Sequence, residues 1–114
     1  MDFVRGDTFL FKFLLKFKDE TVVKSEDIDN LFITFKTSVY SKKYIFQKTL
    51  DDVKIDEEGY VHVTFEPEDT ENLEYGKYVF DVEVTLKNGY RKSKLFEINL
   101  AGETTFHGGD YDGI

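Results

Sequence analysis

Few side chains in this 114-residue sequence have the types and spacing that chemistry requires. Cysteine is absent, which excludes a thiol nucleophile, a thiolate metal site and a disulfide. The two histidines are His62 and His107. His62 lies on the face of an expected strand opposite Val61 and Val63, so we expect a solvated or partner-facing ring there, not a metal ligand or a catalytic base.

A hydroxyl nucleophile would need a neighbouring base and a third group that orients the base. None of the serines shows the strand-to-helix turn that presents such a hydroxyl; they are Ser25, Ser38, Ser41 and Ser93. A hydrolase with two carboxylates is the remaining enzymatic alternative, but the sequence establishes no paired-carboxylate geometry. We therefore predict that the protein is not an enzyme.

Acidic residues gather between positions 51 and 59, where carboxylate oxygens could meet around calcium. The spacing departs from an EF-hand loop, because Lys54 stands at a ligand position and Gly59 comes late. An acidic, solvated turn fits this pattern better, and we predict no metal and no cofactor. The residues concerned are Asp51, Asp52, Asp56, Glu57 and Glu58.

The net charge and the hydropathy pattern exclude two classes of partner. A formal charge of -8 and an isoelectric point near 4.7 argue against binding to nucleic-acid phosphates, which needs clustered Lys and Arg. The apolar segment at 9–17 is interrupted by Lys12 and Lys16, so it is neither a secretion signal nor a membrane span. We predict a single domain with no nucleic-acid and no membrane partner.

The clearest structural signal is a β-hairpin between positions 73 and 100. Apolar and polar residues alternate along its outgoing arm, which is the period of a strand with one buried face. A two-residue Asn88-Gly89 loop would place Phe80 opposite Glu97, on the wrong face. A three-residue loop that starts at Lys87, with Gly89 at positive φ, pairs Phe80 with Phe96, and we predict this register.

A second strong strand signal lies near the N-terminus, and it provides the first candidates for partner binding. Five large residues share one face and predict a central core strand; they are Phe9, Phe11, Phe13, Leu15 and Phe17. The opposite face carries Leu10 and Leu14 between lysines. Because these leucines are apolar on an outward face, we expect another chain or the C-terminal tail to cover them.

Shorter segments complete the expected fold. Alternation predicts further strands near 2–4, 31–36, 44–50 and 60–65, with helical turns after Ser25 and Pro67. About seven short strands without a long helix predict an all-β domain over residues 1–100, an immunoglobulin-like antiparallel β-sandwich.

A local spacing favours the sandwich over a barrel. In immunoglobulin-like domains, a tyrosine at the corner before a core strand hydrogen-bonds backward to the backbone, two residues before a core position that antibodies fill with cysteine. Here Gly76, Tyr78 and Phe80 fit that arrangement, with Phe80 in place of the cysteine. The alternative is that Tyr78 is an ordinary alternating core residue.

The last fourteen residues, 101–114, differ from the rest because apolar alternation stops and half of all the glycines fall there. Their large side chains are Phe106, His107 and Tyr111. Two interpretations stay open: a frayed terminus, or an assembly arm that orders on a neighbouring subunit by adding to a sheet edge.

Three stretches of the sequence resemble a known family. They are Phe3-Val4-Arg5-Gly6-Asp7-Thr8-Phe9, Phe65-Glu66-Pro67-Glu68-Asp69-Thr70, and Leu73 to Glu83 with its Tyr75-Gly76-Lys77-Tyr78 core. They resemble the N-terminal domain of the phage baseplate upper protein family and related short tail-associated proteins of phages of Gram-positive bacteria. Longer members continue into helical and receptor-binding regions, which this sequence lacks, so the resemblance does not imply receptor binding here.

The resemblance implies a non-enzymatic bacteriophage virion structural protein, an assembly module that docks on neighbouring baseplate or tail proteins. Its partners would be other virion proteins, in many copies or as a homo-oligomer, and it would reside in the virion after synthesis in the host cytoplasm. Two alternatives stay open. One is a capsid-surface decoration protein; the other is a carbohydrate-binding module that stacks sugars on Tyr40, Tyr44, Tyr90 and Tyr111.

Overall fold

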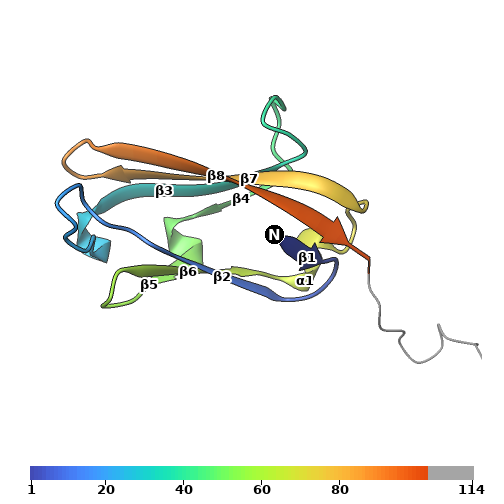
Figure 1. The fold of residues 1–114 in the computed structure, drawn as a ribbon, viewed down its shortest axis with the longest axis horizontal. Helices are drawn as coiled ribbons and strands as arrows, with labels where there is room; N and C mark the ends of the chain where they lie inside the picture. Colours follow the sequence, from blue (N-terminus) through green and yellow to red (C-terminus); the bar gives the residue numbers. More distant parts are fainter. Residues whose placement is uncertain (103–114) are drawn as a thin grey trace, which may run out of the picture.

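The computed structural model describes residues 1–102 and shows two β-sheets packed face to face (Figure 1). One sheet has five strands in the order β1-β8-β7-β3-β4, and the other has three in the order β2-β6-β5. The strands are β1 (Asp2–Val4), β2 (Phe9–Leu14), β3 (Ile28–Lys36), β4 (Phe46–Thr49), β5 (Val53–Ile55), β6 (Tyr60–Phe65), β7 (Gly76–Leu86) and β8 (Arg91–Ala101). The predicted all-β, immunoglobulin-like sandwich is confirmed.

Helical structure is limited to three single turns within the described part of the chain. They are η1 (Ser25–Asp27), η2 (Leu50–Asp52) and α1 (Pro67–Thr70). Pro67 starts α1, where its missing N–H leaves no helical hydrogen bond unmade. Between residues 1 and 102, no helix has the length and apolar character to cross a membrane.

The β7–β8 hairpin has the register that the alternation predicts. Phe80 pairs with Phe96, and Tyr78 pairs with Ile98. Gly89 has a φ of 90°, and the N–H of Leu86 closes the loop by donating to the carbonyl of Tyr90 at 2.8 Å. This register keeps the apolar side chains of both strands on the face that meets the three-stranded sheet.

Three details differ from the sequence-based expectations. β2 is an edge strand, not a central one, because it pairs with β6 alone. Alternation of apolar and polar residues indicates that one face of a strand is buried, but it does not indicate how many strands pair with it. β5 was not predicted, since its three residues are too few to show a period. The pairing of β1 with β8 is parallel, in an otherwise antiparallel sandwich.

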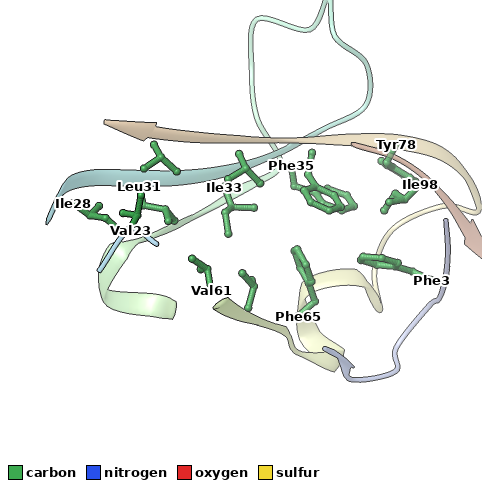
Figure 2. Packing of buried hydrophobic residues seen from close by; sticks show 14 of the residues in the cluster. Phe3, Val23, Ile28, Leu31, Ile33, Phe35, Val61, Phe65, Tyr78 and Ile98 are labelled. Carbon is green, nitrogen blue, oxygen red and sulfur yellow. The ribbon is translucent and has the colours of Figure 1, made fainter. Parts of the chain in front are cut away.

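Phenylalanine rings fill one part of the space between the sheets, and aliphatic side chains fill the rest (Figure 2). Phe3 is 1% exposed, and its ring centroid lies 3.7 Å from that of Phe9 and 5.3 Å from that of Phe65. β1 and α1 lie together at one end of the sandwich (Figure 1), where the N–H of Gly6 donates to the Thr70 hydroxyl at 2.9 Å. That end is therefore closed by Phe3, whereas one long side stays open.

Candidate binding groove

The open side begins at the outer edge of β8. β7 pairs with β8 along nearly its whole length, but on the other side β1 covers only Asn99 to Ala101. Within residues 1–102 no strand pairs with the stretch from Arg91 to Ile98 on that side. β8 is thus a long edge strand with a short cover at one end.

The hydrogen-bond pattern shows which backbone groups face outward. The Tyr90 carbonyl accepts from β7 at Leu86, and the N–H of Asn99 donates to the Met1 carbonyl on β1 at 2.8 Å. Because successive residues of an antiparallel strand alternate between its two neighbours, the odd-numbered residues direct N–H and C=O away from β7. Four residues therefore direct backbone groups along this edge that no strand within residues 1–102 pairs with: Arg91, Ser93, Leu95 and Glu97.

A groove of about 370 Å³ runs between the edge of β8 and the edge of β2. Its floor is aromatic, because the ring of Phe11 meets those of Phe80 and Phe96 edge-on at 5.3 and 5.0 Å. The lining residues are Phe11, Lys12, Phe13, Leu14, Leu15, Lys16, Val82, Val84, Lys92, Ser93, Lys94 and Phe96. The groove thus gives access to the aromatic core where the sandwich lacks a further strand.

The charged side chains of the groove are all lysines. They are Lys12, Lys16, Lys92 and Lys94, and no acidic residue lines the groove. Lys16 forms an exposed ion pair with Glu20 at 3.4 Å. Within the described chain, the other three make no ion pair, and the Lys94 ammonium lies 5.4 Å above the Phe96 ring. In a chain of net charge -8, this groove is a local positive site that favours an acidic ligand.

The residues predicted to bind partners fall in different places. Leu14 lines the groove and is 38% exposed. Leu10, on the same face of β2, is 75% exposed but lies outside the groove lining. Phe106, His107 and Tyr111 lie outside the described residues. Of the two candidates within the described residues, the structure therefore brings Leu14 and not Leu10 to the groove.

The three corner residues have a structural role. The Tyr78 hydroxyl donates to the Glu74 carbonyl at 2.7 Å, and burial raises the pKa of this phenol. Gly76 begins β7 with a φ of 138°, a conformation that favours glycine. Phe80 is fully buried and stacks on Phe96 with centroids 5.0 Å apart. The corner thus fixes the start of β7 and supports the groove floor through Phe80.

His62 pairs with Asp56 through Nε2 and Oδ2 at 2.8 Å, and this hydrogen bond lowers the pKa of the carboxyl. Asp56 also accepts from the N–H groups of Glu58 and Tyr60. The carboxylate therefore organises the turn between β5 and β6. In the described region no three His, Cys, Asp or Glu side chains are grouped closely enough to hold a metal ion.

Of the tyrosines considered for sugar stacking, the three in the described part of the chain do not share a surface. Tyr40 and Tyr44 are exposed in the loop after β3. This loop begins near the start of β7, because Lys36 at the end of β3 pairs with Val79. Tyr90 lies in the β7–β8 turn, several residues further along β7. The fourth, Tyr111, lies outside the described residues.

Sequence reasoning missed the groove residues on β8. Lys92, Lys94 and Phe96 alternate in the sequence, which indicates that they share one face of the strand. Nothing in the sequence indicates that this face meets the edge of β2, since that proximity depends on how the two sheets pack.

Comparisons with known proteins give little further guidance. No protein-family model matches the chain, and no curated protein matches it. Among solved structures, the chain is similar to CopC from Methylosinus trichosporium OB3b, with a TM-score of 0.44 and 14% identity over 71% of this chain and 72% of that chain. A likeness this distant says nothing about ligand or activity.

The prediction of a phage virion structural protein is wrong: CopC, a solved structure to which the chain is similar, is not a phage virion protein, and no family model or curated protein supports a phage function. Capsid decoration and carbohydrate binding, the alternatives to it, find no support in these comparisons. A functional assignment therefore has to come from the groove itself.

Proposed function

We propose that this chain is a non-enzymatic protein-binding domain that takes an extended acidic segment of a partner as an added strand beside β8. The observation that supports this proposal is the open edge of β8 next to an aromatic groove lined by four lysines. An unpaired strand edge is a template for another strand, whose main-chain hydrogen bonds supply affinity.

The side chains of β8 define what the bound segment would carry. Lys92, Lys94 and Phe96 point to the groove at alternate positions. Side chains on neighbouring strands pair across the edge, and opposite charges or two apolar groups stabilise such pairs. The favoured segment therefore has acidic residues beside Lys92 and Lys94 and an apolar residue beside Phe96, with every second residue facing outward.

A labelled synthetic peptide, Thr-Asp-Thr-Asp-Thr-Ile, tests this proposal by fluorescence anisotropy. We expect saturable binding that weakens as salt rises, since added ions screen the lysines. The control peptide Thr-Lys-Thr-Lys-Thr-Ile has the same length and threonines but the opposite charge. We expect it to bind at least about tenfold more weakly, which corresponds to roughly 1.4 kcal/mol.

Two substitutions at Leu95 separate strand addition from charge attraction alone. Leu95→Pro removes an outward N–H, and proline is tolerated at an edge where its N–H side faces solvent. Leu95→Ala keeps that N–H, and this half-exposed side chain lies outside the groove lining. We expect the proline variant to bind the peptide about tenfold more weakly and the alanine variant to bind normally. Equal binding by both variants would contradict strand addition.

A further inference from the structure

The sequence beyond the described residues contains a segment that matches the groove. Residues 103–114 include Glu103, Asp110 and Asp112 and no Lys or Arg. Asp110, Asp112 and Ile114 alternate as acidic, acidic and apolar, in the same order as Lys92, Lys94 and Phe96 on β8. Because the two orders agree in the same chain direction, a segment with this pattern complements β8 when it runs parallel to it.

The structure already contains a strand in this orientation at the same edge. β1 pairs parallel with β8, and Asp2 lies beside Asn99. A segment that ended beside Phe96 would stop before the position that Met1 occupies beside Ile98. It would therefore continue the line of β1 without overlapping it.

The chain's own tail is too short to bind its own groove in this way. From Ala101 back to Lys92, β8 spans nine residue-to-residue steps, or about 30 Å at roughly 3.3 Å per step. The nine steps from Ala101 to Asp110 span at most about 32 Å when fully extended. The extended tail is thus barely as long as the stretch of β8 that it would have to follow. No residues remain for it to pass around β1 and reverse its direction.

The tail also starts beyond the end of β8 that β1 covers. The Arg5 N–H donates to the Ala101 carbonyl at 3.0 Å, and a Cβ at Gly102 would lie 3.3 Å from the ring of Tyr75, over which the Arg5 guanidinium lies at 4.2 Å. β1 pairs with Asn99 to Ala101, so it lies between the start of the tail and the open stretch of β8.

We infer that the groove binds the segment from Asp110 to Ile114 of a second copy of this chain, as a strand parallel to β8. Asp110 lies beside Lys92, Asp112 beside Lys94 and Ile114 beside Phe96. This inference rests on the proposed function, because it names the partner of the same groove. The contact joins two different surfaces, so each copy offers one groove and one tail, and copies associate head to tail.

A charge-exchange pair of full-length variants tests the inference by light-scattering mass. One variant carries Asp110→Lys and Asp112→Lys, and the other carries Lys92→Asp and Lys94→Asp. Each variant places like charges at its own contact, so we expect each alone to stay at the 13.4 kDa of one chain. When mixed, each tail meets a groove of opposite charge, and we expect the mass to rise.

The unmodified chain and a matched variant complete the experiment. The mass of the unmodified chain should rise with concentration, and Glu57→Lys with Glu58→Lys, an equal charge change in the β5–β6 turn, should not alter this. A mass that stays at one chain for the unmodified protein and for the mixture would overturn the inference. If the synthetic peptide still bound, the proposed function would stand and only the tail would be excluded; if neither associated, both would fail.

Discussion

At the scale of single residues, the hydrogen bond of Tyr78 is the contact whose contribution to stability can be measured most directly. Its side chain is 8% exposed, and its hydroxyl donates to the Glu74 carbonyl at 2.7 Å. Tyr78→Phe removes the donor and leaves the partly buried Glu74 carbonyl without this hydrogen bond. We expect the free energy of unfolding to fall by about 1–3 kcal/mol, measured by urea denaturation.

Tyr40→Phe is the matched control for this change. Tyr40 is 90% exposed, so the same loss of a hydroxyl should leave the unfolding free energy within about 0.5 kcal/mol of the unmodified protein. If the two variants had the same denaturation midpoint, the corner bond would contribute nothing to stability.

The corner was predictable from sequence because it is local. Gly76, Tyr78 and the accepting carbonyl of Glu74 lie within five successive residues, so their spacing alone brings them together. The lysines of the groove were not predictable, because Lys12 and Lys94 are far apart in the sequence and meet only through the packing of the two sheets.

At the scale of elements, two turns offer a direct comparison of backbone strain and steric fit. Gly59 and Gly89 both have a φ of 90°, which side chains disfavour. A Cβ at Gly89 would meet nothing within 4 Å, whereas one at Gly59 would lie 2.3 Å from Cγ1 of Val22. We expect Gly89→Ala to cost about 1–2 kcal/mol of unfolding free energy. Gly59→Ala should cost a further 1–3 kcal/mol or about that, by overpacking.

Val22→Ala supplies the control for the Gly59 substitution. In a chain that already carries Val22→Ala, the overlapping methyl group is gone, so Gly59→Ala should cost only about as much as Gly89→Ala. Urea denaturation of the unmodified chain, the two single variants and the double variant measures the cost of Gly59→Ala with and without Val22. An equal cost for Gly59→Ala in the two backgrounds would show that Val22 is not the obstacle.

Strands and turns were predictable where the sequence pattern that determines them lies within one short stretch of the chain. The register of the β7–β8 hairpin follows from its alternation and from Gly89, both within one stretch of sequence. The edge position of β2 does not, because the number of neighbours of a strand depends on the whole sheet. The same limit explains why the open edge of β8 was not expected.

At the scale of the whole molecule, the sandwich is closed at one end and open along one side. Phe3 comes from a strand of only three residues, yet its ring packs against Phe9 and Phe65 of one sheet and Phe80 of the other. Among the described strands, β1 pairs with β8 alone. The sheets are therefore joined at this end mainly by side-chain packing around Phe3.

Phe3→Ala should accordingly destabilise the whole domain and not only its terminus. Truncation of a buried phenylalanine typically costs about 3–5 kcal/mol, because a cavity is left among the remaining rings. Val4→Ala, on the same strand at a side chain that is 38% exposed, is the control and should cost about 0.5 kcal/mol or less. Urea denaturation followed by a whole-domain signal such as circular dichroism measures both. Equally small losses of unfolding free energy in the two variants would show that the packing of Phe3 does not hold the two sheets together.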